Sequence, residues 1–242
     1  MSVLLRKLGC IGLVLWGSLG SIYAQEKINQ VDAEGKKQGL WKGFFEQSKR
    51  LRYQGMFKNG VEVDTFKYYD DTKAQSLLAT RIFSENGTVA KTVFYDQKKF
   101  KVSEGTTINR LKEGLWVYYH KASKQILKEE YYKNDKLHGK QIVYFPGGAL
   151  AEEVNYVNGL KEGVYKVFLE NGIIAEESYF VKNEYHGPAI FRDGKGNVIS
   201  KGNFVKNEKK GIWEFYNEGK LVKKEKYPLR VKFEKRTNIP KP

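Results

Sequence analysis

The stretch YVNGLKEGVYKVFLENGIIAEESYFVKNEYHG, from Tyr156 to Gly187, decides the fold of this chain. It contains Asn-Gly twice, at Asn158-Gly159 and Asn171-Gly172. Asn and Gly tolerate the positive φ angles that tight hairpin turns require. The runs around these turns alternate in polarity and are rich in Tyr, Phe, Val and Ile, which suit half-buried strands. The stretch therefore predicts consecutive β-hairpins.

The same unit recurs along most of the chain. Glycines open five successive copies at a spacing of 24 or 25 residues, at Gly114, Gly139, Gly163, Gly187 and Gly211. Stepping back by the same interval reaches Gly39, a good copy, then Asp64, a weaker one, and Val89, where the pattern is degenerate. We predict an all-β fold, an elongated antiparallel meander of about eight β-hairpin repeats in a single-layer sheet. We expect the third unit to be distorted by a longer loop around Lys98 to Lys112.

Each unit ends on an aromatic residue, and a second turn follows it. The sequence places these turns at Asn134-Asp135, Asn158-Gly159, Asn183-Glu184 and Asn207-Glu208. Two kinds of turn then alternate along the chain, one inside each hairpin and one between hairpins.

Alternation within each strand divides the residues between two faces of the sheet. One face collects the aromatic residues that we predict as candidate binding residues, namely Trp116, Tyr118, Tyr165, Trp213 and Phe215. Stacked neighbours bury such columns, which no single hairpin can bury alone. Packing is the alternative role for most of these rings, but a single-layer sheet has one more face than it can bury.

The repeat resembles the MORN repeat, and especially its bacterial variant class, which includes proteins labelled YwqK-type antitoxins. The pattern G-x-W-x-x-Y is carried by Gly39/Trp41/Phe44, Gly114/Trp116/Tyr119, Gly163/Tyr165/Phe168 and Gly211/Trp213/Tyr216, with Gly139/Tyr144 as a partial copy. The resemblance covers roughly residues 35–227. It implies an elongated hairpin sheet and a binding or scaffolding role towards proteins or anionic lipids. It implies no shared catalytic residues.

The first 24 residues have the features of a secretory signal peptide. Arg6 and Lys7 precede an uncharged apolar run from Leu8 to Tyr23, and Ala24 offers a small residue before Gln25. An uncleaved N-terminal anchor is the alternative. Cys10, the only cysteine, falls inside this segment, so the mature chain is expected to hold no disulfide or Cys-ligated metal. We expect a periplasmic or envelope-associated protein with a lead-in at residues 25–38, repeats at 39–227 and a basic tail at 228–242.

The C-terminal end is strongly basic. Residues 219–242 contain nine Lys or Arg against two Glu. Lys232, Lys235 and Arg236 are therefore candidate contacts to an anionic membrane surface or polymer. A capping edge strand over residues 228–242 is the structural alternative, because repeat arrays need a polar end.

Residues with metal or acid–base chemistry are few. The three histidines are His120, His138 and His186. His138 and His186 both precede an opening glycine, but two units of two strands separate them by roughly 19 Å, too far for one metal ion. We predict no metal site and no cofactor, because phosphate-binding and nucleophile motifs do not occur in the sequence.

The carboxylates repeat with the units instead of forming an asymmetric pair. Glu129, Glu153 and Glu176 form a column that continues as Lys201 and Lys224, which is typical of a solvated charged face. A catalytic pair needs two carboxylates in different environments. We therefore predict that the chain is not an enzyme.

The sequence favours an exported repeat protein that binds or scaffolds a macromolecular partner in a bacterial envelope. A protein partner is expected and nucleic acid is not, while the oligomeric state is left open. Two alternatives belong to other classes. One is an antitoxin or immunity-type inhibitor of a toxin, against which the export signal argues. The other is an envelope enzyme acting on polysaccharide, which needs a cleft that the regular column does not supply.

Overall fold

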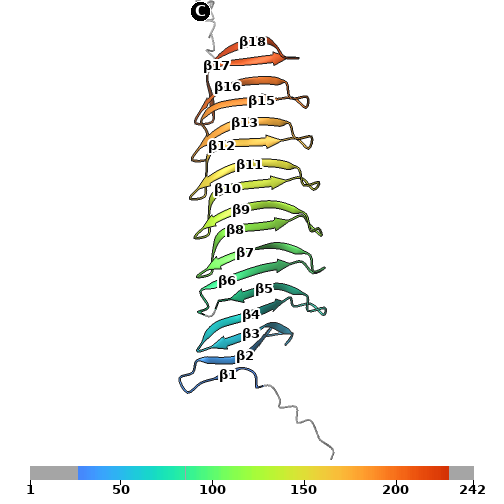
Figure 1. Cartoon of the computed structure of the whole chain (residues 1–242), viewed down its shortest axis with the longest axis vertical. Coiled ribbons are helices and arrows are strands. Elements are labelled where there is room, and N and C mark those ends of the chain that lie inside the picture. The colour runs from blue at the N-terminus through green and yellow to red at the C-terminus, as the bar shows by residue number, and fades with distance from the viewer. Residues whose placement is uncertain (1–26, 85, 229–242) are drawn as a thin grey trace, which may run out of the picture.

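A computed structural model describes residues 27–84 and 86–228. Its strands lie side by side in one long ladder (Figure 1). They are β1 (Gln30–Val31), β2 (Lys37–Phe44), β3 (Leu51–Lys58), β4 (Val61–Tyr69), β5 (Leu77–Phe83), β6 (Val89–Tyr95), β7 (Lys101–Ile108), β8 (Leu111–Tyr119), β9 (Ile126–Lys133), β10 (Lys136–Tyr144), β11 (Leu150–Val157), β12 (Leu160–Phe168), β13 (Ile174–Val181), β14 (Glu184–Tyr185), β15 (Gly187–Arg192), β16 (Val198–Val205), β17 (Glu208–Asn217) and β18 (Lys220–Tyr227).

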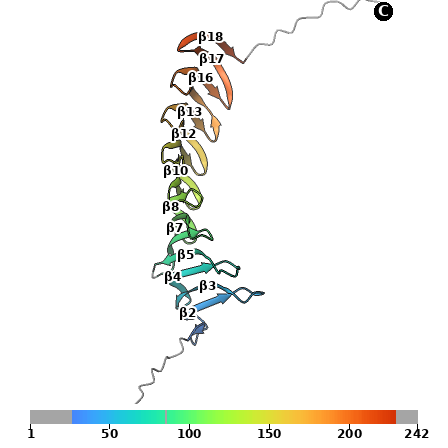
Figure 2. The same ribbon diagram turned by 90° about the vertical axis from the view of Figure 1, so that its right-hand side faces the viewer.

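With the exception of β14 and β15, all strands that are neighbours in the sequence pair antiparallel, from β1 to β18. β14 and β15 act as two halves of one strand, because both pair with β13. The hairpins β2–β3 to β17–β18 are the predicted eight repeats. In the view of Figure 2 they form one column without a second described sheet behind it. The predicted all-β, single-layer meander is confirmed.

The turns between hairpins have two central residues with positive φ, the geometry that matches strand twist. They are Asn59-Gly60, Asn109-Arg110, Asn134-Asp135, Asn158-Gly159, Lys182-Asn183 and Lys206-Asn207. The predictions of Asn183-Glu184 and Asn207-Glu208 were therefore wrong by one residue, since a lysine takes the first left-handed position. Asn171-Gly172 belongs to a longer connection inside a hairpin, where Leu169 N–H donates to Ile173 O at 2.9 Å.

The opening glycines lie beside shifts in strand register. Gly114, Gly163 and Gly211 have φ angles of 66°, 87° and 73°, and the β7–β8, β11–β12 and β16–β17 pairings each slip near them. Such a bulge needs a left-handed residue, which glycine adopts without a Cβ penalty. Asp64 holds the same conformation at φ 56°.

The third repeat departs from this pattern for a local reason. β5 and β6 pair without a register shift, so Val89 needs no left-handed conformation. The longer loop expected around Lys98 to Lys112 was wrong, because β7 occupies residues 101–108. The irregularity lies earlier, in the connection between Phe83 and Val89.

Nearly all buried side chains lie on one face of the sheet, which we call the ring face after Trp41, Phe66, Trp116, Tyr165 and Trp213. Its buried members include Phe66, Ala79, Phe83, Ala90, Trp116, Val154, Phe180, Ala189 and Trp213. The opposite face exposes Ile82, Leu115, Tyr131, Val164, Tyr179 and Ile212. The two faces are therefore not equivalent, and the ring face holds the packing between repeats.

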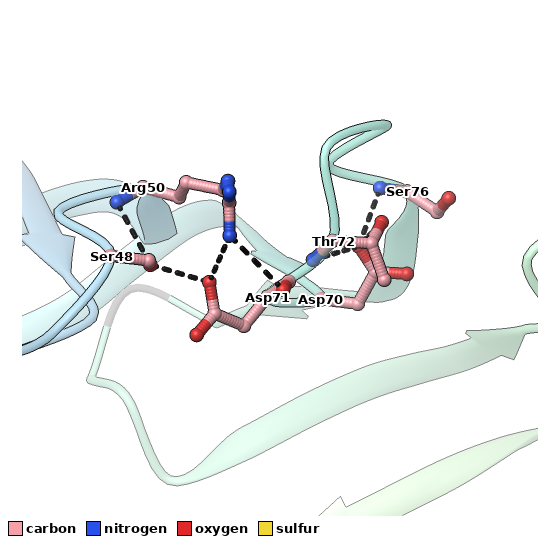
Figure 3. A network of polar contacts seen from close by, with 6 residues as sticks. All are labelled: Ser48, Arg50, Asp70, Asp71, Thr72 and Ser76. Atoms are coloured by element: carbon pink, nitrogen blue, oxygen red, sulfur yellow. Dashed lines mark hydrogen bonds and ion pairs between the residues drawn. The ribbon is translucent and has the colours of Figure 1, made fainter.

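Polar contacts tie the first two hairpin tips together (Figure 3). Asp71 accepts hydrogen bonds from Ser48 and from Arg50, whose Nη1 lies 3.0 Å away. Asp70 accepts from Thr72 Oγ1 at 2.7 Å and from Ser76 N–H at 2.9 Å. The Thr72 hydroxyl is the largest of the contacts that hold the pKa of Asp70 below its usual value. The bonds to Asp71 connect the two neighbouring hairpins at one edge of the sheet, and those to Asp70 hold the connection between β4 and β5.

Candidate functional site

Flat aromatic rings seated on glycines form the centre of the ring face. A Cβ added to Gly105 would lie 2.4 Å from the Trp116 ring, and one added to Gly202 would lie 2.4 Å from the Trp213 ring. The bare glycine backbone lets each ring lie against the preceding strand. This explains why Trp116 and Trp213 are only 2% and 1% exposed.

Both indoles are also held by polar contacts. Trp116 Nε1 donates to Thr106 O and Trp213 Nε1 donates to Asn203 O, each at 3.0 Å. A hydrogen bond of this kind satisfies the one donor that a buried Trp carries. The two rings are therefore fixed in orientation as well as buried.

A lysine covers the ring in four of the repeats. It lies four residues before the aromatic residue, and its Nζ is 4.3 to 4.7 Å from the ring centroid in the pairs Lys37/Trp41, Lys112/Trp116, Lys161/Tyr165 and Lys209/Trp213. Such cation–π contacts contribute about 0.5–1 kcal/mol at exposed sites. The lysines thus line the ring face along one edge of its aromatic column, a pattern that the sequence analysis missed.

The sequence-predicted aromatic residues share the ring face but do not form one cluster. They lie on β8, β12 and β17, and four strand spacings of about 4.8 Å separate Trp116 from Tyr165. Trp116 and Trp213 are packed inside the sheet. Tyr118, Tyr165 and Phe215 are half-buried, so these three offer surface that a ligand can reach. Their binding role stays a prediction. The basic candidates Lys232, Lys235 and Arg236 lie outside the described residues, as does the signal segment.

On the second strand of the fourth repeat, Glu130 occupies the position that Gly105 and Gly202 hold in the third and seventh repeats. It is 3% exposed, and it accepts hydrogen bonds from Tyr132 OH at 2.7 Å and Gln141 Nε2 at 2.6 Å and pairs with Lys128 Nζ at 2.5 Å. Burial opposes ionisation, but these donors together hold the pKa of Glu130 below its usual value. Burial, followed by the bond to Glu130, raises the pKa of Tyr132. A fully satisfied charge of this kind serves packing.

The acidic column predicted from the sequence combined residues of two faces. Register places Glu129, Glu153 and Glu177 in one row of the opposite face, because Ile142 pairs with the first two and Lys166 with the last two. Glu176 was wrongly included, since it pairs with Val167 on the ring face. Alternation inside β13 explains the error, because neighbouring residues point to opposite faces.

Two adjoining cavities lie on the ring face of the first four repeats. The larger, of about 940 Å³, is lined by Lys37, Tyr53, Phe57, Phe66, Tyr68 and Arg110, among others. The other, of about 590 Å³, is lined by Tyr68, Arg81, Phe94, Thr107, Arg110, Lys112 and Trp116, among others. Tyr68 and Arg110 belong to both. We call this surface the basic trough, with a rim of Lys37, Arg81, Arg110 and Lys112. None of these four cations was predicted from the sequence.

Lys37 and Lys112 cover aromatic rings, and the carboxylates of Glu62 and Asp135 also line the cavities, whereas the two arginines have only weak polar contacts. Arg81 Nη2 donates to Thr107 Oγ1 at 3.2 Å, and its guanidinium lies 4.8 Å from the Phe83 ring. The Arg110 side chain is 78% exposed and lies 3.6 Å from Glu62, a long ion pair. Surface pairs of this type contribute little. The arrangement therefore suits binding of an anionic group better than it stabilises the fold.

The described residues contain neither a cluster of metal-ligating side chains nor a helix that could span a membrane. No group of three His, Cys, Asp or Glu side chains in residues 27–84 and 86–228 is placed to hold a metal ion. His120 Nε2 lies 3.2 Å from Tyr144 O, and His138 Nδ1 lies 3.5 Å from Asn158 N. The same segments hold no helix with the length and apolarity that crossing a bilayer requires.

Comparison with known families matches two adjacent hairpins. The family model described as MORN repeat variant matches residues 137–158 and 161–182, which correspond to β10–β11 and β12–β13. The chain contains MORN repeats of the variant type. The MORN family is generally non-enzymatic, and its repeats are associated with binding. The other six hairpins extend the same MORN-like architecture along the sheet.

No curated protein matches the sequence significantly. Among solved structures, a S. aureus TarM mutant in complex with fondaparinux, alpha-GlcNAc-glycerol and UDP shows 15% identity and a TM-score of 0.20, over 48% of this chain and 19% of that one. A protein of unknown function from Bacteroides fragilis shows 8% identity and a TM-score of 0.13, over 71% of this chain and 96% of that one. Scores this low carry no argument about function.

Proposed function

We propose that this MORN-repeat chain is an exported, non-enzymatic protein that binds a macromolecular partner in the bacterial envelope through its ring face. The observation that carries the proposal is the single-layer sheet, whose flanking aromatic residues Tyr118, Tyr165 and Phe215 remain accessible. Extended repeat arrays use such surfaces to bind other macromolecules. The N-terminal segment with its Arg6 and Lys7 supports export.

The carboxylates of the ring face support binding over catalysis. Glu152 accepts a hydrogen bond from Tyr165 OH at 3.1 Å, and Glu176 accepts one from Ser178 Oγ at 2.8 Å. Each carboxylate is engaged by a neighbour in its own sheet. The ring face therefore offers shape and charge to a partner instead of a reacting pair.

Cell fractionation followed by size-exclusion chromatography tests the proposal. We expect the chain in the envelope fraction with Gln25 as its first residue, and we expect it to elute together with a second macromolecule. Recovery from the cytosol with an intact N-terminus would contradict export. Elution of the native chain alone under all gentle extraction conditions would contradict a binding function.

A further inference from the structure

The basic trough uses residues that the repeat does not require. In the central column of the ring face, the second strands of the other seven repeats place Gly55, Gly105, Glu130, Val154, Ser178, Gly202 and Glu225 where β5 places Arg81. Arg81 is the one cation at this position, and the two acidic members, Glu130 and Glu225, each pair with a lysine of their own strand. A long cation in the centre of a packed face needs another explanation.

Arg110 is a second departure in the same place. It occupies the second position of a hairpin turn with φ 70°, where other turns have glycine, Asn or Asp. Those residues tolerate the left-handed region better than arginine does. Two arginines thus occupy positions at which the other repeats carry no cation, and both line the same cavity.

The floor between these cations is apolar. Phe94 is 41% exposed on the ring face, and its ring centroid lies 6.4 Å from that of Trp116. Tyr68 joins the two cavities. An apolar floor with a cationic rim is the surface that an anionic ligand with apolar side groups complements.

We propose that the basic trough binds an extended acidic polypeptide segment that carries apolar side chains. This deepens the proposed function and rests on it, because it names the partner class and the part of the ring face involved. The Arg81 and Arg110 guanidiniums hydrogen-bond its carboxylates, a pairing for which the planar fork of arginine is suited. Its apolar side chains pack on Phe94 and Tyr68.

The dimensions of the trough fit such a segment. The lining extends from β2 to β8, which is six strand spacings or about 29 Å. An extended chain covers about 3.3 Å per residue, so about nine residues follow the trough from end to end. A polysaccharide supplies anionic groups but mostly hydroxyls for the floor, so the apolar lining favours a polypeptide.

Fluorescence anisotropy with defined peptides tests the inference on the full chain. The probe is a labelled peptide of alternating Glu and Phe, about ten residues long, compared with peptides of alternating Glu and Ser and of alternating Lys and Phe. We expect saturable binding of the first only. Binding should weaken strongly between about 50 mM and about 500 mM salt, because part of it is electrostatic.

Matched variants separate the trough from overall charge. The double variant Arg81→Gln with Arg110→Gln should weaken binding by about tenfold or more. The control is Lys67→Gln with Lys91→Gln, which removes the same charge from β4 and β6 on the opposite face. Arg110→Gln alone should weaken binding with no change of fold, since its side chain is largely exposed.

The outcomes decide between partner classes. Equal affinity of the trough variants and the control variants would overturn the inference, as would equal binding of the Glu–Ser peptide. Displacement of the peptide from the trough by phosphatidylglycerol vesicles or by polygalacturonate at lower concentration would assign the site to lipid or polysaccharide. If the trough variant still elutes with the envelope partner, the trough inference fails and the proposed function stands. If the unaltered chain has no partner, the proposed function itself fails.

Discussion

Adding one methyl group at Gly202 should displace the Trp213 ring from its packed position against the Gly202 backbone. The new Cβ would lie 2.4 Å from the ring, whereas ordinary contact begins at 3.4 Å, so the ring must lift by at least 1 Å. That movement stretches the 3.0 Å hydrogen bond from Trp213 Nε1 to Asn203 O. Gly202 itself has no left-handed φ, so backbone strain does not enter the result.

The magnitude follows from overpacking. Gly202→Ala should cost about 1–3 kcal/mol of unfolding free energy. Trp213→Ala should cost about 3–5 kcal/mol, because the ring is fully buried. In the Trp213→Ala background the clash is absent, and Gly202→Ala should instead stabilise the strand by about 0.5–1 kcal/mol. The two substitutions should therefore couple by about 2 kcal/mol or more.

Hydrogen exchange measured by mass spectrometry is the suitable assay, because a repeat array need not unfold in one step. Exchange in β16 to β18 should accelerate in Gly202→Ala while β2 to β5 change little. The control is Gly194→Ala in the same hairpin, whose added Cβ meets nothing within 4 Å. Additive effects of Gly202→Ala and Trp213→Ala, or uniform loosening along the whole chain, would refute the reasoning.

Three further predictions concern single positions. Gly211→Ala should cost about 1–2 kcal/mol, since Gly211 has φ 73°; unchanged denaturant stability would contradict the bulge assignment. Hydrogen bonds, the one from Lys224 contributing most, lower the pKa of Glu214 from 4.5 to about 2. The stabilisation of the fold by the ionised Glu214 is therefore present above about pH 4.5 and is lost as the pH falls towards 2. An NMR titration in which the Glu214 carboxyl shows a midpoint near pH 4.5 would refute this. Asp71→Ala should speed exchange at the first two hairpin tips by removing the Arg50 ion pair, whereas unaltered exchange there would show that the network of Figure 3 does not hold the tips.

The fold could be predicted because its signals are local. Opening glycines at a fixed spacing report the left-handed bulges, and Asn-containing pairs report the tight turns. The boundaries were less certain, because lysine at positions 182 and 206 adopts the left-handed conformation that the sequence assigned to Asn. Packing between neighbouring hairpins then stabilises the sheet, which the strand and turn propensities of single residues do not show.

The candidate site could be predicted only in part. Alternation correctly placed Trp116 and Trp213 on one face, but it does not show that Gly105 and Gly202 seat their rings out of reach. The role of these glycines is to leave room for a ring of the neighbouring strand, so it can be recognised only once the strand pairing is known. Alternation was also insufficient for Glu176, where an error of one residue changes the face.

The basic trough could not be predicted, because its cations come from different hairpins and from a turn between hairpins. Arg81 and Lys112 belong to different hairpins and meet at one cavity only through the strand order. Arg110 lies in a turn, where a charged residue is ordinarily solvated. A comparison of each repeat position along the sequence would have shown Arg81 as the one cation in its column.

Photo-cross-linking in the native envelope tests most directly the claim that the ring face binds a partner. A benzophenone amino acid placed at Tyr118, Tyr165 or Phe215 samples the ring face. One placed at Tyr131 or Tyr179 samples the opposite face, on the strands that pair with those of Tyr118 and Tyr165. We expect one discrete cross-linked species from the ring-face positions and none from the other two. Cross-links that are absent from the ring face, or equally strong from both faces, would contradict the account.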